Sequence, residues 1–198
     1  MSKSRLEAFS DGVIAIIITI TILLIDVPSG NDWKALKTMF PLFAVYAVSF
    51  MLLGSHWANH HHLFQIASHV NGKIIWANLL YLFVISFFPV LTGWVGKSDF
   101  AQVPTIVYVI INMAESLSYM LLQTMILHSQ DCVILKRVVD ESKKELVTIV
   151  TEIAALICAF IYPIHVFAYP LLVVSALIWV VPDIRMSRVF EERMGEEE

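Results

Sequence analysis

The chain has 198 residues, of which 58% are hydrophobic and 15% are charged, and its mean hydropathy is +0.75. This composition is too apolar for an ordinary soluble domain and is typical of an integral membrane protein. The formal net charge of −4 excludes little, because the charges are collected at the chain ends and between apolar runs. No stretch forms a basic stripe, so nucleic acid is not an expected partner.

Six apolar runs, separated by polar or proline-containing connections, predict six transmembrane helices, since about 20 helical residues cross a bilayer. The first five cover approximately residues 9–27, 36–64, 74–95, 103–127 and 146–162, and the sixth follows Pro170 and ends near residue 181. The second run is longer than a bilayer requires, so we expect its polar end, residues 56–62, to project into the interface or beyond. The sequence therefore predicts an all-α, polytopic membrane protein in which residues 1–198 form a single six-helix domain.

The distribution of basic residues tests this count, because six spans place both termini on the same side. Three basic residues fall on the opposite side: Lys34, Lys37 and Lys97. The other ten share the side of the termini: Lys3, Arg5, Lys73, Lys136, Arg137, Lys143, Lys144, Arg185, Arg188 and Arg193. The positive-inside rule then predicts a multi-pass protein of the cell membrane with both termini in the cytoplasm.

No arrangement of residues in the sequence indicates catalysis. A nucleophile elbow, a zinc-protease motif and an intramembrane aspartate pair are all missing from it, so we predict no catalytic residue and no enzyme activity. The filter sequence of classical potassium channels is missing too. Residues 92–96, Thr-Gly-Trp-Val-Gly, resemble it only superficially, because they end an ordinary span.

Three acidic residues fall inside the predicted spans, where a charge is unfavourable by about 2.5–3.5 kcal/mol near the centre. Asp11 lies at the start of the first span. Glu152 lies within two turns of the start of the fifth, where we expect a solvated end residue. Glu115 lies in the middle of the fourth span, near Asn112. Its surroundings fit a buried structural hydrogen-bond cluster and an ion- or proton-handling site equally well.

Histidines gather near the end of the second span: His56, His60, His61 and His62. His56 and His60 are four residues apart and share a helix face, a spacing that can bind zinc. The chain offers no obvious third and fourth ligand, so we favour hydrogen bonding at a helix end and predict no metal site.

The first span carries a recognisable motif, Arg5-x-x-x-Phe9-Ser10-Asp11, followed by Gly-Val-Ile-Ala-Ile. It resembles the signature of the lysosomal potassium channel family, the transmembrane-protein-175 type, in its prokaryotic form. The resemblance continues through Trp57-x-x-His60-His61 and Asn78 and through the count of six spans, and so extends over the whole chain.

The resemblance implies a homotetramer in which the first helix of each subunit lines a central pore, with a constriction made of side chains rather than carbonyls. On that pattern Ile16, Ile20 and Leu23 face the axis, and Thr19 lies at the edge of the same stripe. Positions i, i+4 and i+7 fall within about 60° of one another on a helix, so the stripe is geometrically sound. The hydroxyl of Thr19 is suited to replacing part of an ion's hydration shell.

Helical geometry points Asp11 roughly 140° away from Ile16. We therefore expect Asp11 to be a structural anchor that faces other helices, where Trp57, His60, His61 and Asn78 offer donors. The family's structural motif would then comprise these residues together with Arg5, Phe9 and Ser10.

These observations together predict a potassium-permeable cation channel that conducts passively through a pore lined by the first helix, with a hydrophobic gate. Its partners are further copies of the chain in a homotetramer, the lipid bilayer and permeant K⁺, and no cofactor is expected. The alternative is a secondary transporter or metal-ion carrier in which Glu115 and the cluster His56–His62 bind the cargo.

Overall fold

The computed structural model describes residues 2–129 and 144–180, and within these ranges the protein is helical without any strand. The all-α class predicted from the sequence is confirmed for this part of the chain. The elements, in order, are α1 (Lys3–Ile22), α2 (Trp33–Thr38), α3 (Phe40–Ile66), α4 (Gly72–Ile85), α5 (Phe88–Lys97), α6 (Gln102–Ser129), α8 (Lys144–Phe160), the 3₁₀ turn η1 (Ile164–Phe167) and α9 (Ala168–Val180).

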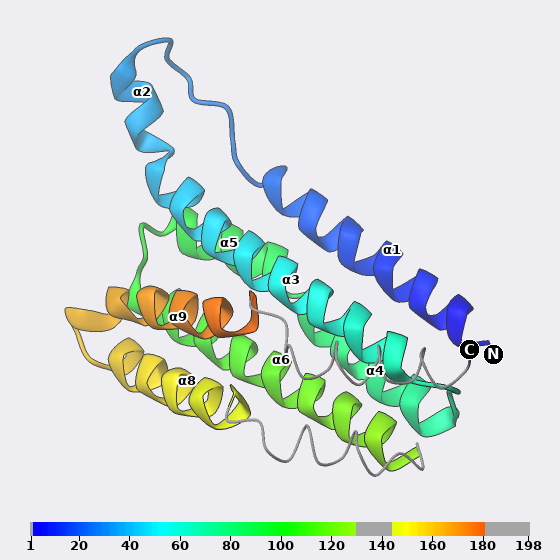
Figure 1. Cartoon of the computed structure of the whole chain (residues 1–198). Helices are drawn as coiled ribbons and strands as arrows, with labels where there is room; N and C mark the ends of the chain where they lie inside the picture. The colour runs from blue at the N-terminus through cyan, green and yellow to red at the C-terminus, as the bar shows by residue number, and fades with distance from the viewer. Residues whose placement is uncertain (1, 130–143, 181–198) are drawn as a thin grey trace.

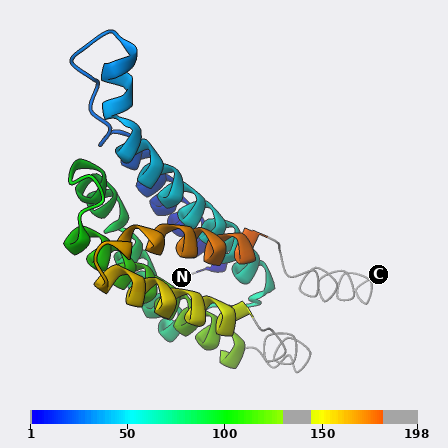
Figure 2. The same ribbon diagram turned by 90° about the vertical axis from the view of Figure 1, so that its left-hand side faces the viewer.

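Helix α3 runs through the middle of the bundle (Figure 1). On one side α1 packs against α3, α4 and α5, and on the other α9 packs against α3 and carries α8 with it. Helix α6 lies beneath, in contact with α4, α5 and α8. The short helix α2 and the loop that leads to it extend beyond one end of the bundle in both views (Figures 1 and 2). Helix α1 is thus an edge helix that one chain covers on one side only.

Prolines and polar caps set the ends of these helices. Pro41 and Pro89 lie in the first turns of α3 and α5, where a missing N–H leaves no hydrogen bond unmade. The side chain of Asn71 caps α4 by accepting a hydrogen bond from the Ile74 amide at 3.1 Å. The third predicted run, residues 74–95, is therefore two consecutive helices that meet near Phe87 rather than one uninterrupted helix.

Three stretches of helix in the described residues are long and apolar enough to cross a membrane: Phe40–Gln65, Gly72–Lys97 and Gln102–Ser129. The stretch Ile164–Trp179 is apolar but shorter. Helix α1, with 20 residues, is about 30 Å long, which is enough to cross, but its first half is charged. The count of six spans stays a prediction. Six of the basic residues that were counted on the side of the termini, at positions 136, 137, 143, 185, 188 and 193, lie outside the described residues.

The polar end of α3, residues 56–62, is packed within the bundle. His56 is 7% exposed beside Glu115 of α6, and His60 is fully buried beside Asn78 of α4. His61 and His62 are half-buried. That this end reaches the membrane interface or beyond stays a prediction. The expectation of a solvated Glu152 is wrong, because Glu152 is 2% exposed and lies on the face of α8 that packs against α6.

Candidate functional site

Helix α1 has two distinct faces. The buried face repeats every three or four residues and consists of Leu6, Ser10, Ile14, Ile17 and Thr21. The other face is left uncovered by the rest of the described residues, with Phe9 51%, Ile16 60%, Ile20 42% and Leu23 77% exposed. A contiguous exposed apolar face of this kind marks a surface that meets another copy, lipid or an enclosed pathway.

The residues predicted to face a pore all lie on this uncovered face. Ile16 and Ile20 are within the helix, and Leu23 is its C-cap, which keeps a helical backbone conformation and so continues the stripe. Val13 and Ile18, by contrast, pack partly against the core. The structure therefore separates the three predicted residues from the packed side of α1, while their role in a pore stays a prediction.

Thr19 lies exposed at the edge of the same stripe. Its hydroxyl donates to the carbonyl oxygen of Ala15 at 2.9 Å, with the Ile16 carbonyl oxygen at 3.0 Å. Because the proton points back along the helix, the lone pairs of the hydroxyl oxygen face outward. An oxygen oriented in this way is able to coordinate a cation.

Asp11 lies on the side of α1 that faces α3. Its Oδ1 accepts a hydrogen bond from Nε1 of Trp57 at 2.9 Å. The Trp57 ring in turn stacks on His61, with ring centroids 6.1 Å apart. Asp11 thus makes a contact between helices, as its angular offset from Ile16 predicted.

A second contact joins three helices inside the core. Asn78 of α4 donates through Nδ2 to the Ser10 hydroxyl of α1 at 2.8 Å, and its Oδ1 lies 2.8 Å from Nε2 of His60 on α3. Ser10, His60 and Asn78 are all 0% exposed. The Ser10 hydroxyl also donates to the Leu6 carbonyl oxygen at 2.9 Å, which completes its hydrogen bonding.

A third contact lies nearer the start of α1 and was missed by the sequence prediction. Oε1 of Glu7 lies 3.2 Å from Nδ1 of His61, and Lys3 donates to the Gln65 carbonyl oxygen at 3.1 Å. Glu7 is four residues before Asp11, so the two carboxylates share a helix face, and this spacing is the signal that could have identified it.

The motif Arg5-x-x-x-Phe9-Ser10-Asp11 is therefore divided between the two faces of α1. Ser10 and Asp11 bind α4 and α3, whereas Arg5 and Phe9 are exposed. Within the described ranges, no hydrogen bond or ion pair joins Arg5 to another residue. Half of the motif thus anchors α1, and the other half is free to contact a neighbouring molecule.

The histidines do not form one cluster. Nδ1 of His56 lies 2.5 Å from Oε1 of Glu115, His60 binds Asn78, and His61 binds Glu7. In the part of the chain that the structure describes, no group of three or more His, Cys, Asp or Glu residues is arranged to hold a metal ion. Glu115 therefore shares a site with His56 alone among the histidines.

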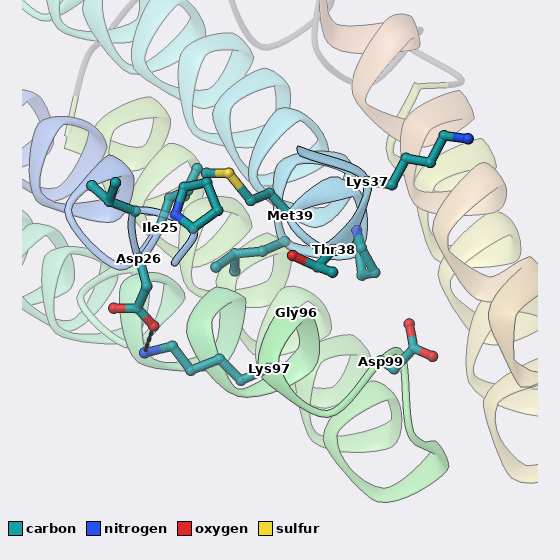
Figure 3. Close-up of a pocket in the computed structure, with 12 residues that line it drawn as sticks. Ile25, Asp26, Lys37, Thr38, Met39, Gly96, Lys97 and Asp99 are labelled. Atoms are coloured by element: carbon teal, nitrogen blue, oxygen red, sulfur yellow. Dashed lines mark ion pairs between the residues drawn. The ribbon is translucent and has the colours of Figure 1, made fainter. Parts of the chain in front are cut away.

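The opposite end of α1 borders a pocket of about 500 Å³, lined by residues 25–28, 37–39, 41–42, 96–97 and 99 (Figure 3). Asp26, just beyond α1, lies with its Oδ2 2.8 Å from Nζ of Lys97 at the end of α5. Both side chains are largely exposed, so this ion pair contributes little to stability.

Comparison with known proteins identifies the family. Residues 5–89 match the family model described as "Endosomal/lysosomal potassium channel TMEM175". A protein of Chryseobacterium sp. (strain P1-3) that is named a potassium channel is 42% identical over 193 residues, which cover 97% of this chain and 100% of that relative. The Homo sapiens protein named endosomal/lysosomal proton channel TMEM175 is 43% identical over 76 residues, which cover 32% of this chain and 15% of that protein.

The fold is similar to a solved structure. The crystal structure of a lysosomal potassium-selective channel TMEM175 homolog from Chamaesiphon minutus superposes with a TM-score of 0.77, at 24% identity, and the match covers 92% of this chain and 98% of that one. The Chryseobacterium relative, which is 42% identical and matched over its whole length, shows the relationship, and the chain belongs to the TMEM175 family.

Proposed function

We propose that the chain is one subunit of a potassium-permeable cation channel that conducts passively along α1. The observation that carries this proposal is the division of α1, whose buried face is fixed by polar contacts while its apolar face, with Ile16, Ile20 and Leu23, is exposed. The family and the named relatives are ion channels, so the protein is not an enzyme. The relatives named potassium channels support K⁺ as the permeant ion.

A pore along α1 requires several copies of the chain, because one subunit contributes a single helix with such a face. We propose a homotetramer in which four copies of α1 surround the axis and α3, α4 and α5 support them from behind. Arg5 and Phe9 project from α1 without cover in the single chain and are available for contacts between subunits. Native mass spectrometry in mild detergent tests this, and a conducting monomer or dimer would contradict it.

In the proposed pore, side chains rather than backbone carbonyls discriminate among ions. Four Ile16 side chains converging on an axis make a narrow apolar ring from which water withdraws, and such a constriction gates conduction by dewetting. Thr19 lies one turn from this ring and supplies four outward-facing oxygens in a tetramer. Together, Ile16 and Thr19 make a hydrophobic gate with a ring of hydroxyl oxygens beside it.

The channel is proposed to reside in the cell membrane as a single domain with six spans and with both termini in the cytoplasm. The three apolar stretches from α3 to α6 support membrane insertion, and the distribution of basic residues supports the orientation. The anchored start of α1 then lies on the cytoplasmic side, and the pocket beside Asp26 lies on the other side.

The alternative, a secondary transporter or metal-ion carrier, needs a shared cargo site at Glu115 and the histidines. The structure instead gives His56, His60 and His61 separate partners. A carrier saturates as its cargo rises, whereas a channel passes a current that grows linearly with driving force. Currents of the reconstituted protein therefore distinguish the two.

The decisive experiment is K⁺ flux through purified protein in liposomes, comparing the wild type with Ile16→Asn. Asn is similar in size to Ile but hydrates a passing ion, so flux should rise and discrimination among monovalent cations should weaken. Leu80→Asn is the matched control, because Leu80 is a similarly exposed apolar residue, at 44%, on α4. An unchanged Ile16→Asn variant alongside an altered control would show that Ile16 does not line the ion pathway and that the exposed face of α4 contributes to it instead.

A further inference from the structure

A buried ionisable cluster lies away from α1, where α3, α6 and α8 meet. It consists of His56, Glu115 and Glu152, one from each helix, which are 7%, 1% and 2% exposed. Each of the three interacts electrostatically with the other two. Among the described residues, no hydrogen bond or ion pair joins any of them to α1, so the pore proposal makes no use of them.

The contacts within the cluster are short. Nδ1 of His56 lies 2.5 Å from Oε1 of Glu115. Oε1 of Glu152 accepts two hydrogen bonds from α6, one from Nδ2 of Asn112 at 2.8 Å and one from the Ser116 hydroxyl at 2.5 Å. The two carboxylates are therefore held by different partners, although both lie between the same helices.

The cluster has more acceptors than donors. Oε2 of Glu115 and Oδ1 of Asn112 are buried and have no hydrogen-bond partner among the described residues. An unsatisfied buried acceptor is unfavourable by about 1–3 kcal/mol. A carboxyl group that takes up a proton becomes a donor, so added protons correct this imbalance.

The charges lead to the same conclusion. If His56 is neutral and both carboxylates are ionised, the cluster carries two buried negative charges, which proteins avoid unless they are paired. Within the described ranges, no Lys or Arg lies within ion-pair distance of either carboxylate. Two protons make the cluster neutral, one shared by His56 and Glu115 and one on Glu152.

Other titratable groups lie around the cluster and are part of its environment. Tyr81 of α4 and Tyr119 of α6 face it, with ring centroids 5.8 Å apart, and Tyr119 packs edge-on against His56 at 6.0 Å. Helix α9 contributes the Trp179 ring, which contacts Tyr119 at 5.7 Å and lies 5.9 Å from the ammonium group of Lys144.

Polar side chains lie between the cluster and the end of the bundle at which α8 begins. On the face of α8 toward α6, Glu145 and Thr148 precede Glu152 at helical spacing, and Glu152 lies about 12 Å along α8 from Lys144. Glu145 accepts a hydrogen bond from Gln123 at 3.2 Å, and Thr148 accepts one from Trp179 at 2.8 Å. The α6–α8 interface is thus lined by polar side chains from that end of the bundle as far as Glu152.

We propose that His56, Glu115 and Glu152 form a proton-binding site. Its occupancy acts on α3, and α3 in turn controls conduction along α1. Protonation neutralises the site and lets α8 pack against α6, whereas proton loss leaves like charges on Glu115 and Glu152 that push these two helices apart. Glu115 also contacts His56, so the change reaches α3. His56 is one residue before Trp57 and four before His60, which hold Asp11 directly and Ser10 through Asn78. A shift of α3 at His56 therefore reaches both anchors of α1.

Proton binding is tested by infrared spectroscopy of the purified protein, which detects the carbonyl band of a protonated carboxylic acid. Solvated Glu loses its proton near pH 4.3, so a band that persists above about pH 6 reports a buried acid. We expect this band in the wild type and in Glu145→Gln, a control on the same face of α8. It should be lost in the double variant Glu115→Gln/Glu152→Gln.

Absence of the band from the wild type, or its survival in the double variant, would overturn the site. If the double variant does not fold, Ser116→Ala answers the same question, because it keeps both carboxyls and removes one donor to Glu152. The band should then remain with a displaced midpoint, and an unchanged midpoint would count against the site.

Control of conduction rests on the proposed channel function and is measured separately, as K⁺ flux against pH on the side where α8 begins. Wild-type flux should depend on pH across the transition of the band, and the double variant should lose that dependence. A double variant that keeps it would refute control through α3. Absence of any wild-type flux would refute the channel instead, and the infrared result would still decide the proton site.

Discussion

Replacement of Asn78 by Leu tests whether the contact among α1, α3 and α4 stabilises the fold. Leu has the same number and branching of side-chain heavy atoms as Asn, so the change removes the hydrogen bonds while keeping the shape of the side chain. His60 loses its only hydrogen bond, because its Nδ1 already has no partner among the described residues. Ser10 loses the hydrogen bond from Asn78 but still donates to the Leu6 carbonyl oxygen.

The magnitude follows from these two losses. Leaving the buried ring of His60 unpaired is unfavourable by about 1–3 kcal/mol, and the second hydrogen bond adds about 0.5–1.5 kcal/mol. The total is about 3 kcal/mol, which corresponds to a fall in Tm of roughly 6–12 °C for a chain of this size. Thermal unfolding of the purified protein, followed by size-exclusion chromatography after heating, measures this shift.

A second substitution makes the test stringent. His60→Phe removes the group that Asn78→Leu leaves unpaired, and Phe keeps the ring that stacks on Tyr81, with centroids 5.6 Å apart. Replacing both polar partners by apolar ones is nearly neutral in a buried site, so the double variant should be more stable than Asn78→Leu alone. Additive destabilisation in the double variant would refute this account of the contact.

Three further predictions test separate features. Thr19→Val should change the K⁺/Na⁺ permeability ratio in planar bilayers while leaving the tetramer intact, because it removes only the outward-facing oxygen; an unchanged ratio would exclude Thr19 from the ion pathway. Asp11→Ala should reduce the yield of assembled protein in size-exclusion profiles more than it changes reversal potentials, since it leaves the Trp57 donor unpaired; a normal oligomer with altered selectivity would contradict the anchoring role. Gly96→Ala should lower Tm, because an added Cβ would lie 2.7 Å from the Leu42 Cα. Gly54→Ala is its control and should raise Tm through helix propensity, because nothing lies within 4 Å of the added Cβ. Equal effects on Tm would be inconsistent with the close approach of α3 and α5.

Local sequence patterns predicted the helices. The face of α1 with Ile16 and Ile20 was implied by the family resemblance, because isoleucines occur all round this helix and periodicity alone does not select a face. Once that face was given, the helical period placed Asp11 away from it and toward other helices. The break between α4 and α5 was also within reach, because Pro89 occurs inside the third apolar run and removes a backbone donor.

Contacts between distant segments were not predictable in the same way. Glu152 lies only eight residues after the start of α8, and this position alone suggested a solvated side chain. Its burial depends on Asn112 and Ser116, which come from a different helix 36–40 residues earlier. The histidines show the same effect, since one helix carries them all while their partners come from α6, α4 and α1.

Helix α3 brings these observations together, because consecutive turns of it serve different parts of the molecule. Ser49, the tenth of its 27 residues, shares hydrogen bonds with Thr92 of α5 and Tyr108 of α6 at 2.6 and 2.8 Å, and these fix the first half of the helix. His56 contacts α6, and the turn after it holds α1 through Trp57 and His60. Because its first half is fixed, α3 can respond to a change at His56 mainly by moving its second half, which is the half that holds α1. The order of contacts along α3 is therefore what would allow a charge on one side of the bundle to alter an ion pathway on the other.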